Sequence, residues 1–233
     1  MSTHQLCAQR RDRCIRVEGP GRRLGRRVLA GVTLALASVW AAGAAHAGPA
    51  AYTIEEDWVV EIGTPDAAGS APQIVTAMSS TLQLADVHAV FEINHTSLPS
   101  FTPGGLQLQV WSGDDLLVYK NSSKTGTLNT LNEVITFKQV MKLSSGKVEF
   151  TINSGASTTW GTFGTSGILK ASLDTTQVDL SNYSPDVSVQ NSYVGFAKHR
   201  VKKLALKEVR YYDKFGNLIQ HDTTERIVHQ LSN

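Results

Sequence analysis

The sequence predicts an all-β fold in which two antiparallel sheets pack face to face as a sandwich. Apolar and polar residues alternate with a period of two through most of the chain after residue 47, as in strands with one buried face. Turn-forming residues interrupt these runs, and no segment of twelve or more residues shows the 3.6-residue period of an amphipathic helix. Residues 48–233 are therefore expected to form a single β-sandwich domain.

The expected strands follow from this alternation. In the clearest run, Leu106, Leu108 and Val110 alternate with Gln107, Gln109 and Trp111. Polar faces rich in Gln, Asn, Glu and Thr rather than Lys are typical of a semi-enclosed concave face, which favours a two-sheet jelly roll. The strands are expected at Thr53–Ile62, Ala89–Asn94, Leu106–Trp111, Val134–Leu143, Lys147–Asn153, Tyr193–Ala197 and Val201–Asp213, the last with an irregularity near Ala205.

Two tight hairpins are expected where glycine and serine separate neighbouring strands. The first joins the halves of Leu106–Lys120 at Gly113, and the second joins the halves of Phe137–Ile152 at Ser145-Gly146. Thr223–Leu231 is expected to form a short terminal helix.

The first 47 residues have the three marks of a cleavable secretory signal. Eight arginines lie between residues 10 and 27, an uncharged run covers 28–45, and Ala45-His46-Ala47 is a small-x-small cleavage site. A transmembrane anchor is the rival interpretation, but the run is mostly Ala and Gly and no basic cluster follows it. The protein is expected to be secreted or periplasmic, and the arginine pairs leave Sec and twin-arginine export both open.

Removal of this segment changes the charge and the cysteine content. The remaining 186 residues carry 14 basic and 18 acidic side chains, a net charge of about −4, whereas the whole chain has +2. This balance argues against nucleic acid and anionic membranes as partners. Both cysteines, Cys7 and Cys14, belong to the removed segment, so disulfides, zinc-thiolate sites and cysteine catalysis are excluded from the domain.

The order of several segments resembles the concanavalin A-like lectin/glucanase sandwiches, loosely in the manner of their alginate-lyase branch. The similar pieces are Gly105–Asp115, Gly146–Asn153, Tyr193–Ala197 and Leu204–Asp213, about half of the domain. Those lyases share a Gln-x-His, an arginine-rich motif and a late Tyr. Here Gln109 occupies the His position after Gln107, no arginine precedes Arg200 in the domain, and Phe196 lies near the Tyr position. The resemblance therefore implies the fold but not the lyase mechanism.

The best candidate site is a polar strand face that carries Gln107, Gln109 and Trp111. If the strands around residues 89–94 and 147–153 belong to the same sheet, Glu92, Asn94, Glu149 and Thr151 join this face. Amides and carboxylates hydrogen-bond sugar hydroxyls, and a Trp ring stacks on a pyranose, so the pattern indicates carbohydrate binding. The alternative is that Trp111 packs under a loop while the glutamines face water.

Three further features leave alternatives open. Glu92 and Glu149 are the candidate acid/base pair of a glycosidase, although two solvated strand carboxylates are the simpler and favoured explanation. Trp160, in a Gly/Thr-rich loop, is expected either to line a ligand cleft or to cap the core. The dispersed histidines argue against a metal site, while Asp114, Asp115 and the turn 182–186 leave calcium open.

Three functions are consistent with these patterns. The first is a non-catalytic polysaccharide-binding protein, which the missing catalytic motifs favour. The second is a polysaccharide-degrading enzyme, either a glycoside hydrolase or a lyase, with an atypical site. The third is a structural protein of the cell envelope or surface. A groove lined by Trp111 would favour the first two, and two carboxyls facing across it would favour the second.

Overall fold

A computed structural model describes residues 49–66, 71–84, 86–96 and 102–232 of the chain. These residues belong to one compact unit. The expected secretory signal, residues 1–47, lies outside the described residues. No helix of the described part has the length and apolarity that a membrane span requires.

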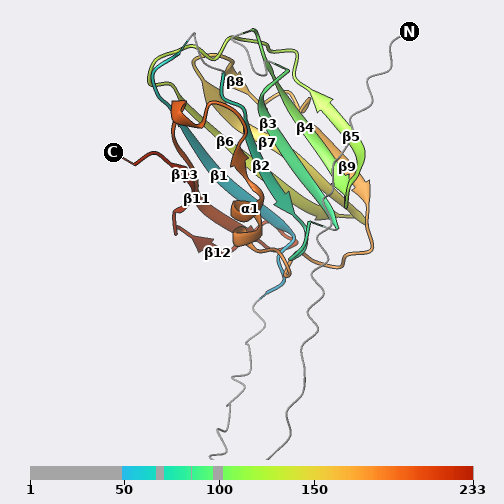
Figure 1. Ribbon diagram of the computed structural model, residues 1–233. Helices are drawn as coiled ribbons and strands as arrows, with labels where there is room; N and C mark the ends of the chain where they lie inside the picture. The colour runs from blue at the N-terminus through green and yellow to red at the C-terminus, as the bar shows by residue number, and fades with distance from the viewer. Residues whose placement is uncertain (1–48, 67–70, 85, 97–101, 233) are drawn as a thin grey trace, which may run out of the picture. The chain divides into compact units, whose positions relative to one another are not determined.

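Two antiparallel sheets make up this unit, which confirms the predicted fold class (Figure 1). Sheet A has eight strands in the order β12-β11-β1-β6-β7-β8, with β13 also paired to β11 and β9 to β7. Its strands are β1 (Thr53–Ile62), β6 (Val134–Ser144), β7 (Lys147–Ser157), β8 (Gly161–Phe163), β9 (Lys170–Asp174), β11 (Val201–Tyr212), β12 (Leu218–Asp222) and β13 (Arg226–Gln230).

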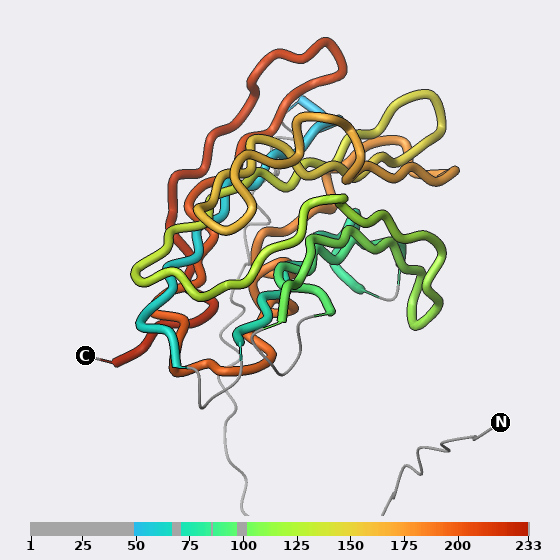
Figure 2. Tube along the Cα trace, turned by 90° about the horizontal axis from the view of Figure 1, so that it is seen from above, coloured from blue at the N-terminus to red at the C-terminus, as the bar shows by residue number. Residues whose placement is uncertain are grey.

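Sheet B has five strands in the order β10-β2-β3-β4-β5. They are β2 (Ile74–Ser79), β3 (Val87–His95), β4 (Gly105–Ser112), β5 (Asp115–Asn121) and β10 (Tyr193–Val194). Seen along the layers, the teal and green strands β2 to β5 lie in one layer and the strands of sheet A form the other (Figure 2). A helix, α1 (Pro185–Asn191), packs against β2, and a short 3-10 turn, Lys198–Arg200, precedes β11.

The core lies between the sheets and is built from the inward residues of each alternating strand. In β1 every second residue from Ile54 to Ile62 is buried, and Trp58 is only 1% exposed, as expected for a core residue. Phe137 stacks beside Trp58 and meets Phe91 edge to face, with ring centroids 6.5 and 5.0 Å apart. These aromatic contacts join β1 and β6 of sheet A to β3 of sheet B.

Both predicted hairpins are present. The β6–β7 turn places Ser145 and Gly146 at φ values of 52° and 72°, the left-handed pair that a two-residue turn between twisted strands requires. Gly113, at φ 56°, lies in the β4–β5 turn. The irregularity near Ala205 is also present, as a register shift between Leu204 and Ala205 in the β11–β13 pairing.

Several elements differ from the sequence prediction: the short strands β8, β9 and β12 and the helix α1 were not expected, and two further differences have a clear physical reason. The terminal helix expected over Thr223–Leu231 is wrong, because Arg226–Gln230 forms β13 on the edge of β11. β-branched Ile227 and Val228 suit an extended strand, and β11 supplies hydrogen-bonding partners there. The strand β2 was not expected, because all six of its residues are buried and it therefore shows no polar alternation.

Candidate functional site

The outward face of β4 carries three of the predicted site residues. Leu106, Leu108 and Val110 point into the core, with at most 1% of each exposed. Gln107, Gln109 and Trp111 alternate with them and therefore lie on the outer face of sheet B. The structure brings these three side chains together in one row, as the alternation predicts.

Neighbouring strands extend this row across the sheet. On β3, Glu92 lies opposite Gln107, Val90 opposite Gln109 and His88 opposite Trp111. On β5, Asn121 lies opposite Gln107 and Tyr119 opposite Gln109. Directly opposed residues of an antiparallel pair point to the same side, so all of them share the outer face. The prediction that Glu92 joins the glutamines agrees with this pairing.

A continuous hydrogen-bond network connects the side chains of Trp111, Gln109, Gln107, Glu92 and Asn121. Trp111 Nε1 donates to Gln109 Oε1 at 2.9 Å, and Gln109 Nε2 donates to Gln107 Oε1 and, at 3.2 Å, to Glu92 Oε2. Gln107 Nε2 donates to Asn121 Oδ1 at 2.6 Å. The Glu92 carboxylate also accepts a hydrogen bond from Gln73 Nε2. Because each amide is held by a neighbour, the orientations of these polar groups are fixed before any ligand arrives.

A β-bulge places His95 in the same network. The register between β3 and β4 shifts between Ile93 and His95, and Asn94 has a φ of 65°. His95 consequently turns to the outer face, where its Nδ1 lies 2.8 Å from Glu92 Oε2 and its Nε2 lies 3.0 Å from Gln107 Nε2. Strict alternation assigns His95 to the core, so the sequence analysis missed it. Asn, which tolerates the left-handed region, was the one signal of the bulge.

The same bulge removes Asn94 from the predicted site. Its side chain is fully buried, and its Nδ2 donates to the carbonyl oxygen of Pro72 at 2.8 Å. The ligand-binding role predicted for Asn94 is therefore wrong, because an outward side chain would require unbroken alternation through β3.

An open groove of about 510 Å³ lies on this face beside the network. Its floor includes Val90, Gln109 and Trp111, while the end of α1 and the β4–β5 turn form its sides. Trp111 is half-buried, so part of its ring faces this space. The full lining consists of Val75, Ala77, Leu84, His88, Val90, Gln109, Trp111, Gly113, Asp114, Gln190, Asn191, Ser192 and Tyr193.

The helix that walls this groove is held from beneath by a buried carboxylate. Glu56 of β1 is fully buried, and its Oε1 accepts hydrogen bonds from Ser188 Oγ of α1 at 2.5 Å and from Tyr183 OH at 2.6 Å. Its Oε2 accepts one from Trp58 Nε1 at 2.8 Å. Burial raises the pKa of Glu56 to about 7, although the three donors and nearby Arg226 oppose this rise. The same burial, together with the Glu56 carboxylate, raises the pKa of Tyr183.

Glu149 and Thr151 do not belong to this site. Both lie on β7, which is part of sheet A, whereas the glutamines and Trp111 lie on sheet B. The two residues therefore do not share the predicted face. Glu149 points outward from sheet A and forms an ion pair with Lys170, whose Nζ lies 2.7 Å from its Oε2. Because Glu92 and Glu149 lie on the outer faces of opposite sheets of the sandwich, they cannot act on one ligand. The predicted acid/base pair is therefore wrong.

Trp160 caps the core rather than lining a cleft. Its side chain is 4% exposed, and its Nε1 donates to the carbonyl oxygen of Gly104 at 2.9 Å. A buried indole whose N–H is already paired offers no free ring face to a sugar. Of the two interpretations left open by the sequence, the ligand-binding one does not fit this burial.

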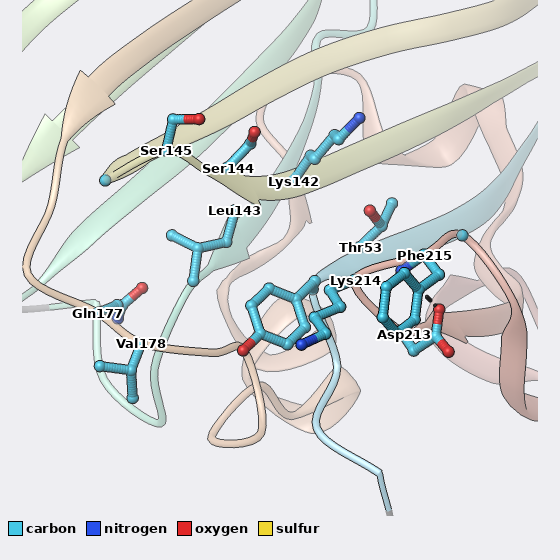
Figure 3. Close-up of a pocket in the computed structure, with 13 residues that line it drawn as sticks. Thr53, Lys142, Leu143, Ser144, Ser145, Gln177, Val178, Asp213, Lys214 and Phe215 are labelled. Carbon is cyan, nitrogen blue, oxygen red and sulfur yellow. Dashed lines mark hydrogen bonds between the residues drawn. The ribbon is translucent and has the colours of Figure 1, made fainter.

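The remaining polar clusters offer less. Within the described ranges, no group of three or more His, Cys, Asp or Glu side chains is placed to hold a metal ion. A second hollow of about 470 Å³ lies between the β6–β7 turn and the β11–β12 turn. Figure 3 shows that the amino groups of Lys142 and Lys214, at this hollow, point in different directions instead of converging. The network beside Trp111 is the candidate site, because it joins sequence-predicted site residues and borders an open groove.

Comparison of the chain with protein-family models, with curated proteins and with solved structures gives no match. The resemblance to lectin/glucanase sandwiches accordingly stays a prediction.

Proposed function

We propose that this protein binds carbohydrate in the groove on the outer face of sheet B and leaves the carbohydrate chemically unchanged. The observation that carries the proposal is the fixed network from Glu92 through Gln107 and Gln109 to Trp111, which borders an open groove. Amide and carboxylate groups at set positions suit the paired hydroxyls of a sugar, and the exposed part of an indole ring suits its C–H face.

The groove itself favours binding over a purely structural role. A structural sandwich needs only a flat polar face, with Trp111 covered by its neighbours. Here Trp111 is half-buried and lines a groove between α1 and the β4–β5 turn. A partly exposed tryptophan at the floor of a concave surface is characteristic of a ligand site.

Two observations favour binding over catalysis. A glycosidase needs two carboxyl groups roughly 5–9 Å apart at one ligand, and the candidate partner of Glu92 lies on the other sheet. Glu92 does orient His95, as a carboxylate orients a histidine base. However, the Nε2 that would accept a proton already faces the Gln107 amide at 3.0 Å.

Isothermal titration calorimetry with a panel of soluble polysaccharides tests this proposal. The protein without residues 1–47 is compared with Trp111→Ala and Gln109→Ala, and we expect each variant to weaken binding at least tenfold, equivalent to about 1.4 kcal/mol. Thr151→Ala, an outward strand residue on sheet A, is the matched control and should bind normally. Normal binding by both site variants would contradict the assigned face, and the lack of binding to any glycan would contradict the function.

Tryptophan fluorescence gives an independent readout of the same face. Three tryptophans lie in the described chain, and Trp58 and Trp160 are almost completely buried. A saturable change in emission on adding a glycan would therefore report on Trp111. Loss of that change in Trp111→Phe, with binding still measurable by calorimetry, would confirm its origin.

A further inference from the structure

We infer that the ligand of this groove is an uncharged polysaccharide and that acidic glycans such as polyuronates or sulfated chains are excluded. The inference rests on the proposed carbohydrate function and specifies the substrate class of the same site. It is based on which charged side chains surround the groove.

The groove and its network contain carboxylates but no lysine or arginine. Asp114 is exposed at one side of the groove, and the Glu92 side chain, at 15% exposed, lies next to Gln109 on its floor. Within the described residues, the groove lining and the network include neither Lys nor Arg, and their basic side chains are His88 and His95. A polyuronate would thus bring carboxylates toward carboxylates with no fixed cation to neutralise them.

Nearby lysines lie elsewhere. Lys120 of β5 pairs with Leu108, a core residue, so it belongs to the inward side of its strand. Lys142, Lys147 and Lys170 are on sheet A, on the far side of the sandwich. Among the described residues, no lysine or arginine of the groove lining or of the network therefore offsets the Asp114 and Glu92 carboxylates.

The rest of the groove supplies what a neutral sugar requires. Gln190 and Asn191 at the end of α1 line the same groove as Trp111 and Gln109 and supply side-chain amides. Tyr193, which is 52% exposed, adds a second aromatic ring. Uncharged donors and acceptors together with aromatic rings recognise hydroxyls and C–H faces, and none of them requires an ionic ligand.

The test compares neutral polysaccharides, such as β-glucans, mannans and xylans, with polygalacturonate, alginate and a sulfated glycan. Binding is measured by calorimetry at about pH 8. Titrations at about 10 mM and about 150 mM salt change the Debye length from about 30 Å to about 8 Å. We expect the affinity for a neutral glycan to change little with salt. At low salt, every acidic glycan should bind at least tenfold more weakly than the neutral glycan does.

A pair of charge variants tests the cause. Asp114→Lys replaces the carboxylate at the groove, whereas Asp115→Lys changes the neighbouring residue, which does not line it. We expect Asp114→Lys to strengthen acidic-glycan binding at low salt at least threefold more than Asp115→Lys does, with neutral binding unchanged. Equal effects of the two variants would overturn the electrostatic argument.

The outcomes separate this inference from the function on which it rests. Tighter binding of an acidic glycan than of any neutral one, lost in Trp111→Ala, would overturn the inference and leave the carbohydrate function in place. The lack of binding to every glycan of the panel would overturn the function itself. Preferential binding of a neutral glycan, lost in the same variant, supports both.

Discussion

Glu56 offers the most direct test of how the sandwich is held together, because a single atom change removes its charge and keeps its shape. Its carboxylate lies in the core and accepts hydrogen bonds from Tyr183, Ser188 and Trp58. In Glu56→Gln the side-chain oxygen can still accept from Tyr183 and Ser188, while the new amide group meets the Trp58 N–H. That donor–donor contact adds a constant cost that does not depend on pH.

The expected effect follows from the pKa of this group. Burial raises the pKa of Glu56 from 4.5 to about 7 in the folded protein. The folded state therefore holds the proton more tightly than the unfolded state, so the free energy of unfolding falls as the pH rises from about 4.5 to above 7. The difference between the two pKa values corresponds to about 3 kcal/mol. Below 4.5 the group is protonated in both states and contributes no pH dependence.

Urea unfolding followed by far-ultraviolet circular dichroism, at fixed pH values between about 4.5 and 8, measures this effect. The free energy of Glu56→Gln minus that of the unaltered protein should rise by about 3 kcal/mol across this range. Other carboxylates with shifted pKa values, such as Asp57 and Asp222, are present in both proteins and cancel in the difference. Glu55→Gln, an outward neighbour, is the control. A difference that stays constant with pH would refute the reasoning.

Two further predictions concern the packing of the sandwich away from the groove. Trp160→Phe removes the indole donor to the Gly104 carbonyl, which keeps its hydrogen bond from the Gly126 N–H, and leaves part of the indole's core volume unfilled. It should cost about 1–3 kcal/mol in urea unfolding, yet leave glycan binding by calorimetry unchanged; weakened binding at full stability would restore Trp160 as a ligand residue. Gly164→Ala places a Cβ 2.4 Å from the Ile152 carbonyl oxygen at a φ of +81°. Gly146→Ala has a similar φ of +72° but open space around the new Cβ, so it should cost about 1 kcal/mol. Gly164→Ala should therefore destabilise the protein by more than Gly146→Ala. Equal urea midpoints for these two glycine variants would contradict the packing described here.

The strands with one exposed face could be predicted from the sequence. In such strands apolar residues that face the core alternate with polar residues that face the solvent. Thr53–Ile62 was predicted with its observed bounds, and both hairpins were located from their glycines. The strand Ile74–Ser79 lacks that alternation, since α1 packs against it and all six residues are buried. A strand that is buried on both faces shows no alternation of apolar and polar residues, so the sequence pattern does not identify it.

The candidate site was predicted in part for a related reason. The alternation places Gln107, Gln109 and Trp111 on one face, but sheet membership depends on pairing between distant segments. Glu92 and Glu149 have similar local patterns, and only the pairing of β3 with β4 and of β7 with β6 separates them. The bulge at Asn94 then exchanges the roles of two neighbours, moving His95 into the network and Asn94 into the interior.

The strand pairing of the two sheets also determines the order in which the fold can be completed. In sheet B, β2, β3, β4 and β5 pair in sequence, so each new strand finds its partner already made. In sheet A, Thr53 of β1 pairs with Lys142 on one side and with Tyr212, 159 residues later, on the other. The strands β2 to β5, which carry the network, can thus pair early. The segments α1 and β10, which complete the groove and sheet B, and the strand β11, which completes the pairing of β1, all come late in the chain.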